Sequence, residues 1–412
     1  MRYLFIFILI TLKLSSVAQT SNWEPIGNGV NWGIKCFYED TVEDKLYIGG
    51  NFTSVDTIQN VYCIAVLNNQ TWETEISKLD HICSDITGYQ NDIYAGGYFV
   101  YADTVKVNAV GRWDGNQWYP VGEGFGGGVI YNLKVINNEL FACGCFDSSS
   151  INVVNSLAKW SGSEWVSVYN FPRFDSITPN YIFDIAYFNG EFYVAGNFGY
   201  SDMSVMDIVK YNGTEWVDVG GSMKGGMAAI SRMEVYNNEL IVAGMFWKQD
   251  GNTGNFIQAW DGTQWKELGG GVSGYMQLPN SNGQIHEMKI NNGDLYVGGV
   301  FTYAGGVPAP HMARWDGTEW CGFGGNFNNN IYSFGFYRDT LYIGCGTMVD
   351  SIQVNNLARW VGGSHVDTCG AINSINETVY EDKSILVYPN PAQDEITIET
   401  SDINNEFFEI SI

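Results

Sequence analysis

The sequence has 412 residues, 45% of them hydrophobic and 15% aromatic, so it can form a large core and is not globally disordered. Its 45 acidic and 20 basic residues give a formal net charge of −25. This charge disfavours nucleic acids and anionic lipid headgroups as partners, because both are negatively charged. The 49 glycines against 9 prolines indicate tight turns between short strands.

Residues 1–18 have the pattern of an export signal. Arg2 supplies a positive start, an apolar run extends from Leu4 to Leu12, and small residues lead up to Ala18. This run is too short to span a bilayer, which takes roughly 20 helical residues. We therefore predict a signal peptide cut after Ala18 and no transmembrane segment. Export permits disulfides, but we interpret most of the eight cysteines as small core residues and leave their connectivity open.

A glycine-containing segment recurs seven times along the chain, and its copies are 46 to 55 residues apart. This period is typical of a four-stranded propeller blade, whereas a helical solenoid would show a period of 3.6 residues. The copies are Leu46–Phe52, Ile93–Phe99, Leu140–Phe146, Phe192–Phe198, Leu240–Phe246, Leu295–Phe301 and Leu341–Thr347. We therefore predict an all-β fold, a seven-bladed β-propeller with four antiparallel strands per blade.

Each unit predicts four strands around this segment. Asparagine and glycine pairs such as Asn237-Asn238 precede it, as hairpin turns require. A tryptophan, a tight turn and a second tryptophan follow it, as in Trp315 and Trp320. We interpret the tryptophans as packing between neighbouring blades. Trp23 resembles a fourth strand but precedes the first complete unit, so we expect it to complete the last blade and close the ring.

One polar column lies on the first strand of each unit, eight positions before the glycine-containing strand begins. First strands line the axis of a propeller, so we expect these side chains to ring one end of a central channel. The column consists of Asp85, Asn132, Asp184, Arg232, Glu287 and Ser333. A mixed ring with three acids could bind a divalent cation or a polar glycan. The alternative is a water-filled channel with solvated walls.

The sequence offers no catalytic or metal-binding motif. None of the four histidines has metal-ligand spacing to another, and no nucleophile elbow is present. We therefore name no catalytic residue, no metal ligand and no cofactor apart from the divalent cation that the ring could hold. Paired carboxylates remain open, because acids from different blades could meet across the channel.

The repeat resembles propeller repeats that are common in secreted proteins of Bacteroidetes. The resemblance rests on the pattern L-Y-V-G-G-x-F followed by A-R-W-D-G-T-x-W, and it is also similar to repeats of fungal cortical-marker ectodomains. It implies a propeller over residues 19–370. It implies no particular ligand, because propellers serve unrelated functions.

A second resemblance follows a linker at residues 371–383. Residues 384–412 contain Tyr388, Pro389, Asn390 and Pro391, and this segment resembles the start of a type A sorting domain of type IX secretion. The resemblance implies a small β-sandwich recognised by the outer-membrane export machinery. The sequence ends at Ile412, before the later strands of that family, so we expect a partial domain.

Two functions from different classes remain. The first is a secreted or surface-attached binding or adhesion propeller, whose ligand is an extracellular glycan or protein. The second is an extracellular carbohydrate-active enzyme, which predicts a carboxylate pair in the channel with the pKa of one member raised. We favour the first, because the sequence shows no acidic constellation that departs from the repeat.

Overall fold

The computed structural model describes residues 22–76, 78–174, 180–199, 206–225, 229–274 and 283–362, together with the backbone of two further strands at 385–388 and 397–400. The predicted signal peptide, the linker 371–383 and Pro389 to Pro391 lie outside the described residues. By its contacts the chain divides into two units, Asn22–Ile372 and a second made of Met1–Ser21 with Asn373–Ile412. No helix in the described part of the chain is long and apolar enough to cross a membrane.

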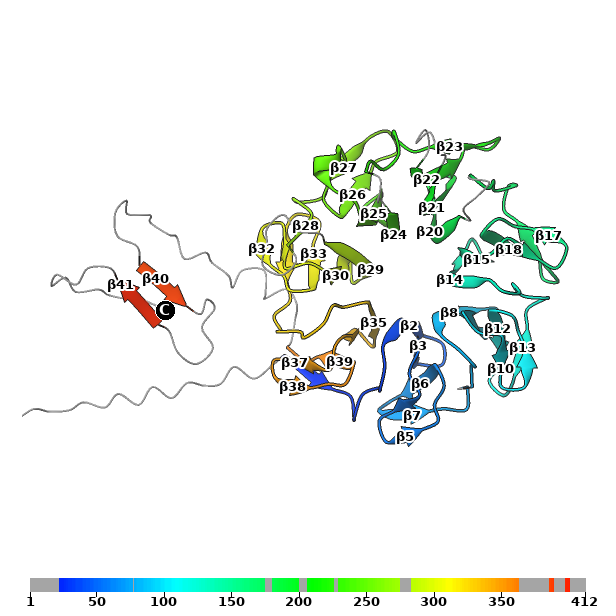
Figure 1. Ribbon diagram of the computed structural model, residues 1–412, viewed down its shortest axis with the longest axis horizontal. Helices are drawn as coiled ribbons and strands as arrows, with labels where there is room; N and C mark the ends of the chain where they lie inside the picture. Colours follow the sequence, from blue (N-terminus) through cyan, green and yellow to red (C-terminus); the bar gives the residue numbers. More distant parts are fainter. Residues whose placement is uncertain are drawn as a thin grey trace, which may run out of the picture. The chain divides into compact units, whose positions relative to one another are not determined.

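The first unit contains seven four-stranded antiparallel sheets, which follow one another around a ring (Figure 1). In each sheet the first strand lies nearest the axis of the ring. Sheets 1 to 4 consist of β2 (Ile34–Asp40), β3 (Lys45–Gly50), β6 (Ile64–Asn68) and β7 (Thr71–Glu73); β8 (Cys83–Tyr89), β9 (Asp92–Gly97), β12 (Val110–Trp113) and β13 (Trp118–Pro120); β14 (Val129–Ile136), β15 (Glu139–Cys145), β18 (Leu157–Trp160) and β19 (Trp165–Ser167); and β20 (Tyr181–Phe188), β21 (Glu191–Gly199), β22 (Met206–Tyr211) and β23 (Trp216–Asp218).

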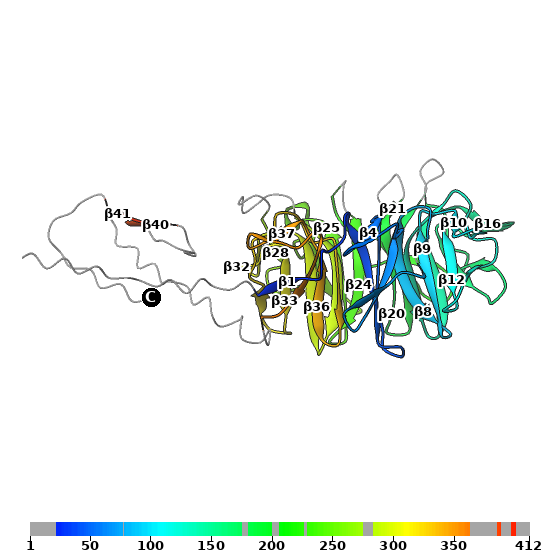
Figure 2. The same ribbon diagram turned by 90° about the horizontal axis from the view of Figure 1, so that it is seen from below.

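Sheets 5 to 7 continue the ring in the same order. They consist of β24 (Ala229–Tyr236), β25 (Glu239–Met245), β26 (Ile257–Trp260) and β27 (Trp265–Glu267); β29 (Gln284–Asn291), β30 (Asp294–Val300), β33 (Met312–Trp315) and β34 (Trp320–Gly322); and β35 (Ser333–Tyr337), β36 (Thr340–Gly344), β39 (Leu357–Trp360) and β1 (Trp23–Pro25). The side view in Figure 2 shows the strands of these sheets running across the thickness of the ring. The described fold is therefore all-β and propeller-like.

Short hairpins occupy most of the connections between the second and third strands. They are β4 (Ser54–Val55) with β5 (Ile58–Gln59), β10 (Tyr101–Ala102) with β11 (Val105–Lys106), β16 (Ser148–Ser149) with β17 (Asn152–Val153), β31 (Tyr303–Ala304) with β32 (Val307–Pro308) and β37 (Met348–Val349) with β38 (Ile352–Gln353). β28 (Val272–Ser273) joins β31, and a 3-10 turn, η1, covers Lys248–Asp250. In the second unit β40 (Ile385–Tyr388) pairs antiparallel with β41 (Thr397–Thr400).

Local turn chemistry sets the first hairpin of each sheet. Asn237 and Asn238 take φ values of 47° and 63°, and Asn189 and Gly190 take 50° and 82°. Two consecutive positive φ values match the right-handed twist of the flanking strands, and asparagine and glycine adopt them at low cost. The predicted turns are confirmed at these positions.

The core is divided among the seven interfaces between neighbouring sheets. Seven hydrophobic clusters fill them, one for each pair of adjacent sheets, including one between sheets 7 and 1. Each sheet therefore buries both of its faces, and the ring of contacts is closed.

The tryptophan columns belong to these interfaces, as predicted. The rings of Trp315 and Trp320 lie 5.3 Å apart, and Trp320 Nε1 donates to the carbonyl oxygen of Leu268 in the preceding connection at 3.0 Å. Trp118 and Trp165 make the same bond to the preceding connection, each at 3.0 Å. The indole thus contributes apolar area and a satisfied donor at once.

The N-terminal strand closes the ring, as predicted. β1 pairs with β39 in a register that sets Trp23 opposite Trp360. Trp23 is 1% exposed, and its Nε1 donates to the carbonyl oxygen of Gly324 at 2.8 Å. Sheet 7 therefore contains strands from both ends of the unit.

A β-bulge interrupts the first strand of sheets 1 to 6, and it explains a glycine column. In sheet 3 the register shifts between Ile130 and Asn132, so Tyr131 is the extra residue. The bulge brings the carbonyl of Val129 to 2.0 Å from where a Cβ on Gly144 would lie, so only glycine fits there. The same close approach recurs at Gly50, Gly97, Gly196, Gly244 and Gly299. In sheet 7, β35 pairs without a register shift, and Cys345 takes the place of the glycine.

Candidate functional site

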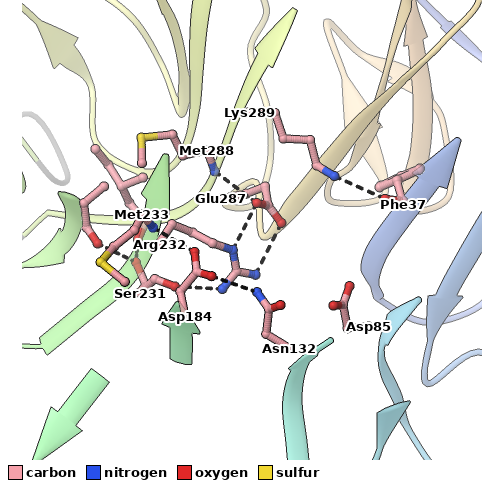
Figure 3. Close-up of polar contacts among 12 residues, drawn as sticks. Phe37, Asp85, Asn132, Asp184, Ser231, Arg232, Met233, Glu287, Met288 and Lys289 are labelled. Atoms are coloured by element: carbon pink, nitrogen blue, oxygen red, sulfur yellow. Dashed lines mark hydrogen bonds and ion pairs between the residues drawn. The ribbon is translucent and has the colours of Figure 1, made fainter. Parts of the chain in front are cut away.

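Most members of the predicted polar column stand next to the bulges of their strands. Asp85, Asn132, Asp184, Arg232 and Glu287 each come directly after the extra residue of their strand. Figure 3 shows them on first strands of successive sheets around the axis. We call these five residues the polar ring. Their bonds run mainly between neighbouring sheets.

Asp184 is the most heavily bonded member of the polar ring and is only 1% exposed. Its Oδ1 accepts hydrogen bonds from the backbone N–H of Ile185 at 2.7 Å and from Lys134 Nζ at 3.0 Å. Its Oδ2 accepts one from the backbone N–H of Met233, on sheet 5, at 2.8 Å. Asn132 Nδ2 also lies 3.4 Å from Oδ1. This carboxylate therefore joins sheets 3, 4 and 5.

Arg232 and Glu287 form a bidentate ion pair between sheets 5 and 6. Arg232 Nε and Nη2 lie 3.0 and 3.3 Å from the two carboxylate oxygens of Glu287 (Figure 3). Burial opposes ionisation of Glu287, but the charges of Arg232 and Lys289 hold its pKa below the usual value. Burial likewise opposes the charge on Arg232, and Glu287 outweighs it, so the guanidinium pKa is raised. Both side chains are therefore ionised, and each provides hydrogen-bond partners for the other.

Asp85 differs from the other acids of the polar ring. Its Oδ2 accepts a hydrogen bond from the backbone N–H of Leu133, on sheet 3, at 2.7 Å. Burial raises its pKa to about 6, although that hydrogen bond and the charges of Arg232 and Lys289 act in the opposite direction. Asp85 therefore titrates well above the usual range of an aspartate.

Ser333 holds the corresponding register position on sheet 7, because it pairs with Gly344 as Asp85 pairs with Gly96, but β35 has no bulge. Ser333 is fully buried, and its hydroxyl donates to the carbonyl oxygen of Ile34 at 3.0 Å, across the interface between sheets 7 and 1. The ring position in sheet 1 is taken by Cys36, which pairs with Gly49 as Asp85 pairs with Gly96. Counting eight positions back misses Cys36, because the hairpin between β2 and β3 is longer. Counting along the register from the glycine would have found it.

A second set of charges on the same strands was missed by the sequence reasoning. Lys134, Glu234 and Lys289 each stand two residues after a ring member, on the same side of the strand. Lys134 stays 26% exposed while it contacts Asp184, and Lys289 Nζ donates to the carbonyl oxygen of Phe37 at 3.2 Å. Burial raises the pKa of Glu234. The sequence signal that could have found these three residues is their spacing of two from a ring member, because alternate residues of a strand share a face.

The extra residues of the bulges form a further layer, which we call the rim layer. It consists of Lys35, Ser84, Tyr131, Phe183, Ser231 and His286. The rings of Tyr131 and Phe183, on neighbouring sheets, lie 5.2 Å apart. On sheet 6, His286 lies 4.9 Å from the ring of Tyr332, and Lys35 Nζ lies 5.3 Å from the same ring. Burial, helped by Arg232, lowers the pKa of His286 to about 4, so this imidazole is neutral at pH 7.

The chemistry open to this arrangement is limited by its internal bonds. Asp184 and Glu287 accept hydrogen bonds from cationic and backbone donors, which stabilise the ionised carboxylates and weaken them as general bases. Among the residues that the structure describes, no three histidine, cysteine, aspartate or glutamate side chains are grouped to hold a metal ion. What remains accessible is a half-exposed rim of aromatic and small polar side chains above a neutralised ring.

These features define an all-β, propeller-like scaffold with a polar, internally bonded axis. The sequence matches no known protein family. It matches no curated protein either. Among solved structures it is similar to the extracellular domain of a B. thetaiotaomicron protein described as a one-component system, with 11% identity and a TM-score of 0.49, over 82% of this chain and 40% of that one. It is also similar to the WD40 β-propeller domain of Doa1, with 10% identity and a TM-score of 0.45, over 82% of this chain and 97% of that domain. The chain thus spans less than half of the first of these proteins.

Proposed function

We propose that the chain is a secreted or surface-attached seven-bladed β-propeller that acts as a non-catalytic binding module. The seven sheets and the seven clusters between them support the blade number. The observation that carries the binding function is the internal bonding of the polar ring, in which Asp184 and the Arg232–Glu287 pair join neighbouring sheets. The ligand is an extracellular glycan or protein, and it contacts the half-exposed groups near the axis.

The export route is part of the same proposal. Residues 1–18 act as the signal peptide, residues 371–383 as the linker, and residues 384–412 belong to a type A sorting domain that engages the type IX secretion machinery. Tyr388, Pro389, Asn390 and Pro391 form its recognition segment. The chain then belongs with the secreted Bacteroidetes propeller proteins that its repeat resembles. Support comes from the residue pattern at both ends of the sequence.

A second candidate function has one specific observation in its favour. A carbohydrate-active enzyme needs one protonated and one ionised carboxyl group, and the pKa of Asp85 is raised to about 6 whereas that of Glu287 is lowered. Against it, Glu287 is held by both nitrogens of the Arg232 fork, and Asp85 accepts the Leu133 N–H. We therefore rank catalysis second.

The two functions are separated by measuring binding and turnover on the same protein. A glycan array and a protein-ligand screen detect binding, and a polysaccharide-hydrolysis screen detects turnover. We expect binding without product release. Hydrolysis by the wild-type chain that disappears in Asp184→Asn, Glu287→Gln or Asp85→Asn, but not in the exposed control Glu164→Gln, would overturn the proposal in favour of the enzyme.

A further inference from the structure

A small pocket lies beside the rim layer on sheet 3. It has a volume of about 330 Å³, near the lower end of the range found for ligand pockets. Its lining comes from the connection before β14, the last residue of β15, the two residues that follow it and the first residue of β16, and consists of Gly126, Gly127, Gly128, Cys145, Phe146, Asp147 and Ser148. The pocket is therefore formed largely by backbone, with few side chains to fill it.

Different structural constraints apply to the three glycines that line the pocket. At Gly128 an added Cβ would lie 2.6 Å from Phe146 Cβ, so packing requires glycine there. Gly127 has a φ of 78°, which side chains rarely adopt. Gly126 has neither constraint, because nothing lies within 4 Å of its Cβ position and its φ is not positive. A side chain at Gly126 therefore meets no steric barrier.

Aromatic rings adjoin this pocket. Tyr131 stands on β14, three residues after Gly128, and its ring packs against Phe183. Burial raises the pKa of the Tyr131 hydroxyl to about 12, with smaller contributions from Cys145, which lines the pocket, and from Tyr181. The register supports this proximity, because Cys145 pairs with Val129, two residues before Tyr131, and Tyr181 remains 38% exposed.

The pocket contains one acidic side chain, which is paired with an arginine. Asp147 lines the pocket, and Arg173 Nη1 lies 3.2 Å from its Oδ1. The ion pair engages Oδ1 of this carboxylate. An anionic ligand would meet this carboxylate on a chain with a net charge of −25, so an uncharged ligand is favoured.

We propose that this pocket binds one residue of an uncharged saccharide, with the adjoining Tyr131–Phe183 pair contacting the next residue of the chain. The inference rests on the proposed binding function and names its ligand class and its place. The apolar face of a sugar ring packs on aromatic rings, and its hydroxyl groups bond to carboxylate and backbone groups, which are the two kinds of surface found here.

Gly126→Trp tests the pocket with little risk to the fold. Gly126 lines the pocket and nothing lies within 4 Å of its Cβ position, so the wall has room for the new side chain. Gly324→Trp is the matched control, because Gly324 lies in the corresponding connection before sheet 7 and also has nothing within 4 Å of its Cβ position. The full chain is titrated calorimetrically with uncharged glucan, mannan, galactan and xylan fragments, and thermal unfolding is recorded for each variant. We expect Gly126→Trp to weaken binding at least about tenfold, with no change for Gly324→Trp.

Tyr131 tests the aromatic part of the site. We expect Tyr131→Ala to weaken binding about tenfold, whereas Tyr131→Phe, which keeps the ring, binds nearly as wild type. Uronic-acid fragments serve as the charged comparison and should bind more weakly than the uncharged ones. Equal binding by wild type and Gly126→Trp would refute the pocket while leaving the binding function intact. Failure of every uncharged fragment to bind wild type would refute the saccharide assignment, and hydrolysis of a fragment would instead refute the proposed function.

Discussion

Replacing Trp23 by alanine should open the ring at its closing strand. The side chain is almost fully buried, and its ring lies 4.9 Å from that of Trp360 and 5.4 Å from that of Phe327. Its Nε1 also satisfies the carbonyl oxygen of Gly324. Because β1 has only three residues, few other contacts hold it on β39. The substitution therefore removes most of what fixes the strand.

The expected loss in the free energy of unfolding is estimated from the buried area of the Trp23 side chain and from its lost hydrogen bond. A buried aromatic side chain covers roughly 150–250 Å², and at about 25 cal/mol per Å² this corresponds to about 4–6 kcal/mol as an upper bound. The lost hydrogen bond contributes about 1 kcal/mol. Measured tryptophan-to-alanine changes in cores cost about 3–5 kcal/mol, so we expect a loss of about 4 kcal/mol in the free energy of unfolding. Trp23→Phe keeps the ring contacts and should lose about 1–2 kcal/mol.

Urea unfolding followed by circular dichroism measures these differences. Trp32→Ala is the matched control, because Trp32 is 61% exposed and stands nine residues further along the chain. We expect the control to change the unfolding free energy by no more than about 0.5 kcal/mol. Equal losses for Trp23→Ala and Trp32→Ala would refute the closure argument.

Three further predictions concern buried polar groups. Asp184→Asn removes the carboxylate that pairs with Lys134, so the free energy of unfolding in urea should fall by about 3 kcal/mol. In a double-mutant cycle with Lys134→Met, the loss in the double mutant should be smaller than the sum of the two single losses. Strict additivity would contradict the pairing. The pKa of Asp85 is raised to about 6 in the folded chain, so the stability gained by its protonated form is fully present below pH about 4 and is lost as the pH rises through about 6. The stability advantage of Asp85→Asn over wild type should therefore grow across that window, and a constant difference in urea midpoints would be inconsistent with it. Iodoacetamide should modify the partly exposed Cys145 of the native chain before Cys143, whose burial raises its pKa well above the usual value, and peptide mass spectrometry reports the order.

The sequence carried enough information for the repeat, the hairpins and the closing strand. These depend on local signals, such as the asparagine turns at Asn237-Asn238 and the paired tryptophans, which act within one unit. The position of Trp23 before the first unit and the weak fourth strand of the last unit were sufficient to predict their pairing.

The candidate site was predicted only in part, because its bonds join different sheets. Position along the strand placed Asp184 and Glu287 in one column, but which partner each acquires depends on the twist of neighbouring sheets. A bulge changes which residues share a face, and the sequence shows it only through the glycine on the opposite strand. Counting positions along the chain therefore included Ser333 but missed Cys36, which holds the same register position on sheet 1. Cys321 is disulfide-bonded, which its spacing in the sequence did not indicate.

The pairing of each bulge with a glycine on the neighbouring strand also affects how the exposed surface of such a protein can change during evolution. The register shift depends on the glycine of the second strand, and the extra residue that it produces is not required for pairing. Six strands accordingly carry lysine, serine, tyrosine, phenylalanine, serine and histidine at that residue on the same backbone. Substitution there changes the chemistry presented at the rim and leaves the ladder pairing in place, although Ser231 Oγ also donates to the carbonyl oxygen of Ile285 on the neighbouring sheet. Ligand preference can then change one repeat at a time, and a library that varies these six residues would sample new specificities on one backbone.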